Sequence, residues 1–451
     1  MFLSRRSLFK RSSLLAGAAT LPSWMPRLAF RQPGVPQRGD VLVVIFQRGG
    51  MDGLSAVVPY EEPQYYNLRP RIAFKQPNAG DPKTVIPLTA QFGLNPALVG
   101  LQRAWDNGHL AVVTAAGSPD PSRSHFDAMD YMERGTPGQK SSNDGWLGRH
   151  LATTAKQNDS PFRAIGMGSI LQQSLRGPVP AAALQSIADF HLQGRSADLA
   201  IFRQQLEALY GGGDWFDQDA RATFQALDML EAANLHQSQP ENGAVYPDSP
   251  LGNGLKQIAQ LIKADLGLEI ACVDMGGWDT HVNMVWTNNG DPTFGQMYNL
   301  LKQLNDAIFA FYTDLGRDRF EDPGVTLVTM SEFGRRVAQN AANGTDHGHG
   351  NSMFILSGAA VQGVHTQWPG LEPQNLVDGD LAITTDYRDI LSEILLKRLG
   401  NPQLDLIFPG YTPVFRGVVN GRPNTPPLAT PPPAGGQANA HAVYLPRVGK
   451  K

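Results

Sequence analysis

The chain has 451 residues, of which 41% are hydrophobic and 18% are charged. This is enough to bury a sizeable core in one large domain or in two or three smaller ones. The formal net charge of -3 supplies no basic field for a phosphate backbone, which excludes nucleic acid as the expected partner. Cys272 is the only cysteine, so no intrachain disulfide forms and stability must come from packing or from bound metal.

The first 30 residues have the character of an export signal. Arg5 and Arg6 precede a mild apolar stretch over residues 14–21, which is the order of a charged and then a hydrophobic region in signal peptides. We interpret residues 1–30 as a twin-arginine signal peptide, with a disordered basic tail as the alternative. This predicts a periplasmic or otherwise exported protein and the twin-arginine export machinery as a partner. The apolar stretch is shorter than the ~20 residues of a membrane-spanning helix, so we expect no permanent membrane span.

Five short apolar runs predict the strands of a sheet. They cover residues 41–46, 110–115, 270–275, 325–330 and 353–356. Each run is apolar almost throughout, as in strands that are buried on both faces. Between the third and fourth runs, residues 296–315 repeat apolar side chains every three or four positions, which predicts a helix. We therefore expect an α/β fold with a doubly wound, mostly parallel sheet and helices on both faces.

The remaining segments suggest the domain organisation. We place the α/β domain at residues 38–421, with a helical insertion at about 161–252 that contains helix-like patterns and few strand signals. Residues 422–451 form a proline-rich tail with little capacity for a core.

Charged and imidazole side chains follow the predicted strands, at the edge where open α/β sheets bind ligands. Asp52 follows the first strand in a glycine-rich turn and offers a hard oxygen ligand, although such an Asp is often a simple turn residue. Asp279 and His281 follow the third strand, and Glu332 and Arg335 follow the fourth.

A second histidine segment precedes the fifth strand. It contains Asp346, His347 and His349 between glycines. Imidazole ligands favour zinc, iron or manganese over calcium, so these loops predict a transition-metal site. A backbone-capping aspartate and a histidine turn without metal are the alternatives.

The loop after the second strand contains Ser122, Arg123 and Ser124 just before a helix-like pattern. A hydroxyl at a helix N-terminus beside an arginine is a candidate nucleophile. Serine is also a preferred N-cap residue, and that simpler role stays open.

Taken together, these motifs resemble a known family. Residues 46–53, 124–127, 277–281, 331–335 and 345–348 are similar to the exported bacterial family called domain of unknown function 1501, over about residues 41–400. That family is itself similar to the alkaline phosphatase and sulfatase superfamily, whose members use paired metal ions to transfer phosphoryl or sulfuryl groups. The resemblance implies an alkaline phosphatase-like fold. It also implies one or two divalent ions, because Phe333 stands where the superfamily has a ligand histidine.

The function implied is a metal-dependent hydrolase of phosphate or sulfate esters, acting on a small anionic ester or a polysaccharide. Ser124 or Ser122 would attack, and Arg123 or Arg335 would neutralise the anionic group. The implied metal ligands are Asp52, Asp279, His281, Glu332, Asp346, His347 and His349. The alternative is a non-catalytic envelope protein that keeps the fold and binds a ligand or polysaccharide. A partner-binding role for the helical insertion is a third class.

Overall fold

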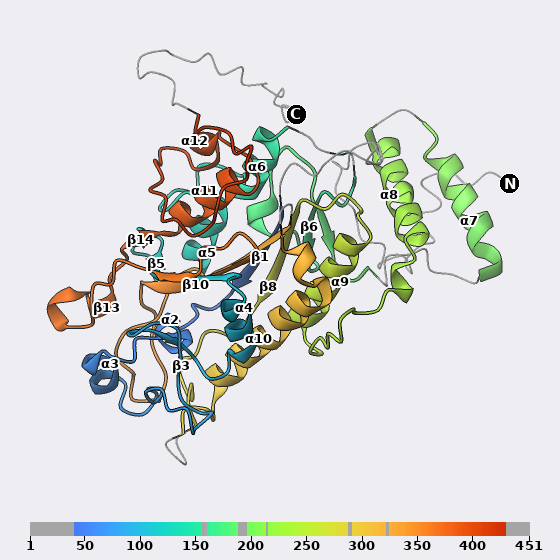
Figure 1. Cartoon of the computed structure of the whole chain (residues 1–451). Coiled ribbons are helices and arrows are strands. Elements are labelled where there is room, and N and C mark those ends of the chain that lie inside the picture. Colours follow the sequence, from blue (N-terminus) through green and yellow to red (C-terminus); the bar gives the residue numbers. More distant parts are fainter. Residues whose placement is uncertain are drawn as a thin grey trace, which may run out of the picture.

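In the computed structural model, the described residues are 40–429 without 156–157, 159, 188–195, 213–214, 287–290 and 322–323. The predicted signal peptide and residues 430–451 of the predicted tail lie outside this part of the chain. A central sheet with helices on both faces organises the rest (Figure 1).

The sheet has nine strands in the order β11-β5-β10-β9-β1-β8-β6-β7, with β14 also paired to β5. All pairings are parallel except those of β10 with β5 and β9. The carboxyl ends of β1, β5, β8 and β9 therefore meet at one edge, and β10 begins at that same edge. The strands are β1 (Val41–Gln47), β5 (Leu110–Gly117), β6 (Ala164–Met167), β7 (Ala182–Leu184), β8 (Ile270–Met275), β9 (Val325–Met330), β10 (Asn351–Ser357), β11 (Gly363–His365) and β14 (Thr385–Asp386).

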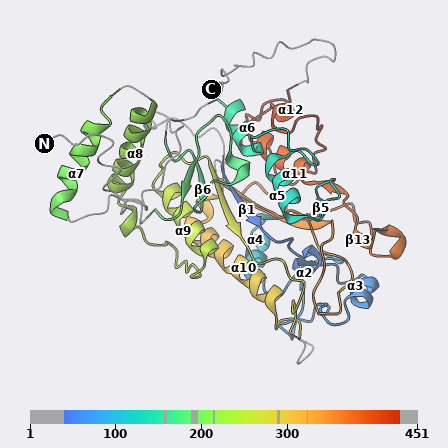
Figure 2. The ribbon, with the colours of Figure 1, turned by 180° about the vertical axis from the view of Figure 1, so that it is seen from behind.

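Two layers of helices cover the sheet (Figure 2). One face carries α4 (Val99–Asp106), α9 (Pro250–Lys263) and α10 (Gln296–Leu315). The other face carries α5 (His125–Arg134), α6 (Trp146–Thr153), α11 (Tyr387–Lys397) and α12 (Leu404–Ile407). The predicted α/β class, the five strands and the helix at 296–315 are all confirmed.

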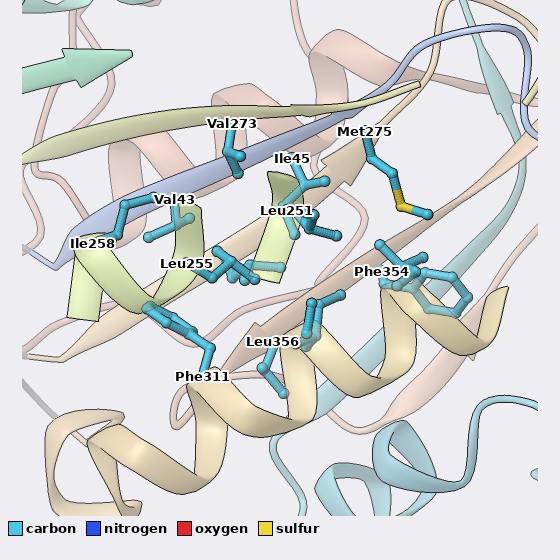
Figure 3. Close-up of a cluster of buried hydrophobic side chains, with 14 of the residues drawn as sticks. Val43, Ile45, Leu251, Leu255, Ile258, Val273, Met275, Phe311, Phe354 and Leu356 are labelled. Carbon is cyan, nitrogen blue, oxygen red and sulfur yellow. The ribbon is translucent and has the colours of Figure 1, made fainter. Parts of the chain in front are cut away.

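The alternation of side chains along β1 explains why its sequence is apolar throughout. Val43 and Ile45 pack toward α9 and α10, as Figure 3 shows with Leu255 of α9 and Phe311 of α10. The intervening residues of β1 belong to the second core on the opposite face. Both faces of the strand are buried, so no polar alternation is possible.

The span 161–252 differs from the expected helical insertion. It contains β6 and β7, which extend the main sheet beside β8. These strands are only four and three residues long and contain alanine and glycine in place of most β-branched residues, so their sequence carries little β signal. The α-helices described in this span are α7 (Ser196–Leu209), α8 (Trp215–Ala232) and the first turn of α9, and α7 and α8 lie beyond the β6 side of the sheet in both views (Figures 1 and 2).

Short elements complete the described chain. No helix in that part is both long enough and apolar enough to cross a bilayer. The remaining helices are α2 (Gly53–Ala56) and α3 (Pro63–Leu68), and the 3-10 turns are Gln173–Leu175, Leu235–Gln237, Arg317–Arg319 and Pro373–Asn375. The minor strands are β2 (Val57–Val58), β3 (Ile86–Pro87) and β4 (Gly93–Leu94) in one small sheet, and β12 (Leu376–Val377) with β13 (Asp380–Leu381) in another.

Candidate metal centre

Histidine and carboxylate side chains from three segments converge at the carboxyl edge of the sheet. Asp279 and His281 come from the loop after β8, and His347 precedes β10. His125 is the first residue of α5, which begins where the loop after β5 ends with Ser124 as N-cap. The topology brings these segments together because β5, β8 and β9 are parallel and β10 runs the other way.

The geometric centre of this cluster is one carboxylate oxygen, Asp279 Oδ1. The Nε2 atoms of His281, His347 and His125 lie 3.1, 3.2 and 3.4 Å from it. Candidate ligand atoms of His125, Asp279 and His347 all lie within 4.8 Å of one another. His281 joins them through its Nε2, which is 2.9 Å from Nε2 of His347. Three imidazoles thus present the same ring nitrogen to one point.

The other nitrogen of each ring contacts an oxygen acceptor. His125 Nδ1 lies 2.8 Å from Glu332 Oε1, and His281 Nδ1 lies 2.8 Å from Asp346 Oδ1. His347 Nδ1 lies 2.8 Å from the backbone carbonyl of Arg123. Carboxylate and carbonyl oxygens only accept hydrogen bonds, so each Nδ1 must be the donor. Each neutral ring therefore carries its lone pair on Nε2, facing Asp279.

The facing Nε2 atoms of His281 and His347 indicate a cation-binding arrangement. Two Nε2 lone pairs that face each other at 2.9 Å repel unless a proton or a cation lies between them. The buried Nε2 of His125 makes no hydrogen bond with any described residue. An imidazole fixed through Nδ1 by a carboxylate or carbonyl, with Nε2 left for a cation, is the usual arrangement of metal-ligating histidines. The donor set of imidazoles and one carboxylate fits zinc, manganese or iron.

Asp279 is fixed by Arg335, whose side chain is fully buried. Arg335 donates to Asp279 Oδ1 at 2.6 Å and also to the carbonyls of Gly50, Thr345 and Trp278. Partial burial alone would raise the pKa of Asp279, but the hydrogen bond and the charge of Arg335 outweigh it, and the pKa is lowered to about 2. The carboxylate is therefore ionised at any physiological pH. The predicted role of Arg335 in neutralising a substrate stays untested, and here its guanidinium serves the protein itself.

The protonation of the histidines follows their surroundings. The hydrogen bond with Glu332 raises the pKa of His125, despite its partial burial. Burial lowers the pKa of His347. The hydrogen bond from His281 lowers the pKa of Asp346. Formally, Asp279, Glu332 and Asp346 exceed the charge of Arg335 by two negative charges, which suits a divalent cation.

Glu332, a predicted metal ligand, contacts the His125 ring on the side away from Asp279. Its side chain is fully buried and accepts hydrogen bonds from the backbone of Gly49 at 2.7 Å and from Ser331 Oγ at 3.1 Å. Its Oε1 faces His125 Nδ1. The structure therefore places Glu332 as the group that orients His125, just as Asp346 orients His281.

Asp52 lies in a different environment. Both its carboxylate oxygens contact Nη1 of Arg69, at 2.9 and 3.0 Å, and one accepts from Thr345 Oγ1 at 3.2 Å. Its Oδ1 also caps α2 by accepting from the backbone of Ser55. Asp52 and Arg69 are both buried. The oxygens predicted to bind metal are occupied by a buried ion pair.

His349 and Arg123 are directed to other partners. His349 Nε2 contacts the carbonyl of Asp120 at 3.0 Å, and the Arg123 guanidinium pairs with Asp380. Arg123 is partly exposed, and its backbone carbonyl holds His347. His349 therefore stands beside the cluster and not in it.

The two candidate serines differ in how firmly they are held. Ser122 Oγ accepts from the backbone N–H of Ser124 at 3.2 Å. Ser124 Oγ accepts from the backbone N–H of Asp127 at 3.5 Å, at the limit of a hydrogen bond, and Ser124 is exposed. Ser124 also directly precedes His125. Of the two hydroxyls, that of Ser124 is the less engaged.

His125 is not among the ligands that the sequence motifs predict. It lies in segment 124–127, in which Ser124 is the predicted nucleophile and N-capping is the simpler alternative. Its position in the sequence does indicate the site, because His125 follows the end of a predicted strand by ten residues. Asp52 and Asp279 also follow the ends of predicted strands, by fewer residues. Phe333 packs its ring 5.0 Å from that of His125 and 4.9 Å from that of His347. It forms an apolar wall of the site.

The sequence profile of a protein family of unknown function, DUF1501, matches residues 108–400. A search of the curated proteins found no match.

Solved structures similar to this chain have low identity to it. The C-terminal periplasmic domain of EcEptC from Escherichia coli, in complex with Zn, is 12% identical with a TM-score of 0.35, covering 90% of this chain and 95% of that one. A protein in the alkaline phosphatase superfamily from Vibrio parahaemolyticus is 10% identical with a TM-score of 0.28, covering 75% and 64%. Alkaline phosphatase from the Antarctic bacterium TAB5 is 9% identical with a TM-score of 0.26, covering 72% and 93%.

Proposed function

The chain belongs to the protein family DUF1501, whose name assigns no activity, and from its own site we propose that it is an exported, metal-dependent hydrolase of phosphate or sulfate esters. The predicted twin-arginine signal supports the export part of this proposal. The arrangement of three histidines around Asp279 supports the metal part.

The observation that carries the proposal is the shared orientation of the three rings. Each Nδ1 is held by an oxygen acceptor, and each Nε2 is within 3.4 Å of Asp279 Oδ1. We assign His125, His281, His347 and Asp279 as the residues that would hold the ion. When bound, a divalent transition metal supplies Lewis acidity toward an ester oxygen.

The other residues have supporting roles. Glu332 and Asp346 hold the proton on Nδ1 of His125 and His281, which keeps Nε2 available. Arg335 keeps Asp279 ionised and in place. Phe333 packs an apolar ring against two of the imidazoles. The side chains of Asp279 and His281 are 48% and 39% exposed, so a substrate can approach the cluster from solvent.

We assign Ser124 as the attacking nucleophile in preference to Ser122. Its hydroxyl is exposed, its capping bond is long, and it lies at the N-terminus of α5, where the helix dipole favours a developing negative charge. Arg123 pairs with Asp380 but is partly exposed and adjacent to Ser124, so it is the arginine of the two that an anionic ester can reach. Arg335 is too buried for that role.

The test is hydrolysis of aryl phosphate and aryl sulfate esters by the mature protein supplied with zinc, manganese or iron. We expect turnover that His125→Ala and Ser124→Ala abolish and that Ser122→Ala retains. Ser124→Ala should still bind metal. A protein that binds metal but hydrolyses neither ester class would contradict the hydrolase and leave the alternative, a non-catalytic envelope protein that binds a ligand or polysaccharide.

A further inference from the structure

A second candidate site lies on the loop that also carries His281, in a cavity of about 450 Å³. Its walls come from the loop after β8 and from the first turns of α10. The cavity shares that loop with the metal centre, because Val282 of its wall directly follows His281. The loop is also fixed to α10: Gln296 Nε2 donates to the carbonyl of Gly277 at 3.2 Å.

The apolar part of the wall is unusually exposed. Trp286 and Val282 are 51% and 56% exposed, and Leu300 completes the apolar lining. Phe294, whose backbone carbonyl accepts from Trp286 at 2.7 Å, is a third exposed large hydrophobic residue on this loop. An indole left half exposed in the lining of a cavity offers a flat surface for a ligand to stack on.

The polar part of the wall consists of carboxamides only. The described lining residues contribute four of them, Asn283, Gln296, Asn299 and Gln303, and no ionised side chain. Each carboxamide has N–H donors and a carbonyl acceptor, so it can donate a hydrogen bond to a ligand hydroxyl or accept one from it. An ionic ligand finds no counter-charge in this lining, and a purely apolar ligand would leave the carboxamides unpaired.

A stacking indole surrounded by uncharged donors and acceptors matches one class of ligand, a polyhydroxylated ring. We infer that this cavity binds a neutral sugar residue of a glycan. On the proposed function, on which this step rests, the esterified sugar next to it would reach the histidine cluster, so the substrate class is a phosphorylated or sulfated glycan. The volume is within the roughly 300–1,000 Å³ usual for small-ligand sites.

The experiment measures binding of unesterified neutral oligosaccharides to the full-length mature protein by isothermal titration calorimetry, with a panel of hexose-based oligomers. We expect at least one to bind, and Trp286→Ala to weaken it about tenfold or more, the loss of one aromatic stacking contact. Gln303→Ala should weaken it as well. Ile170→Ala, which removes a residue 72% exposed elsewhere on the surface, should leave binding unchanged.

A His125→Ala/His347→Ala variant separates this inference from the proposed function. Sugar binding that persists in this variant while metal binding is lost supports a separate sugar subsite. Equal sugar affinity of wild type and Trp286→Ala, or no binding by any oligosaccharide of the panel, would overturn the inference and leave the metal centre unaffected.

Discussion

Replacing Asp52 by Asn distinguishes a structural carboxylate from a metal ligand. Asp52 and Arg69 have side chains 1% and 0% exposed, and Arg69 Nη1 lies 2.9 and 3.0 Å from the two carboxylate oxygens. Asn keeps the shape but removes the charge, which leaves the buried guanidinium without compensation. Removing one partner of a buried pair costs about 3–5 kcal/mol. We expect this loss in the free energy of unfolding of the metal-free protein, measured by urea denaturation.

Asp346→Asn is the matched comparison, because Asp346 is 53% exposed and contacts His281 at 2.8 Å. Its loss should cost less than about 1 kcal/mol of stability, as for exposed ion pairs. It should nevertheless weaken metal binding about 10-fold or more, as the loss of groups behind metal ligands does. Asp52→Asn should bind metal with wild-type affinity while folded. An Asp52→Asn protein of unchanged stability that no longer binds metal would refute this reasoning and restore Asp52 as a ligand.

Three further changes test other parts of the account. Glu332→Gln removes the carboxylate that orients His125, and we expect metal affinity, measured by competition with a chelating dye, to fall about 10–100-fold; unchanged affinity would show that His125 needs no such support. Gly49→Ala should cost at least about 1–3 kcal/mol, because φ is +121° and the new Cβ would lie 2.6 Å from the backbone nitrogen of Asp279. Gly108→Ala, with φ of +76° and no atom within 4 Å, is its control and should cost less in the same urea experiment. Burial and the charge of Arg163 lower the pKa of His150 to about 3, whereas the unfolded chain binds this proton below about pH 6.5. The free energy of unfolding is therefore highest above pH 6.5 and decreases as the pH is lowered, by about 2 kcal/mol at pH 5. A His150→Gln variant should lack this component, and identical pH profiles of the two proteins would contradict it.

The strands and the ends of strands could be predicted from the sequence, whereas the partners of the site residues could not. Residues 270–275 and 325–330 are strands because a continuous apolar run fits a strand buried on both faces, and the loops after them carry Asp279 and Glu332. The strand Ala164–Met167 is too short to show that pattern, so the sequence predicts a helical insertion across it.

Tertiary contacts decided the roles of the carboxylates. Glu332 and Asp279 both follow strands, but one faces Nδ1 of His125 and the other faces its Nε2. Asp52 also follows a strand, β1, but its carboxylate forms a buried ion pair with Arg69, 17 residues further along the chain. Sequence spacing identifies the edge at which these groups gather. It does not say which oxygen faces a cation and which faces a guanidinium.

The central claim is that His125, His281, His347 and Asp279 bind a divalent transition metal. The most direct test is elemental analysis of the mature protein, purified without chelator or metal-affinity tag, alongside a His125→Ala/His347→Ala variant. We predict about one equivalent of zinc, manganese or iron in the native protein and none in the variant. A native protein that holds no metal even after incubation with all three ions, or a variant that retains it, would contradict the claim.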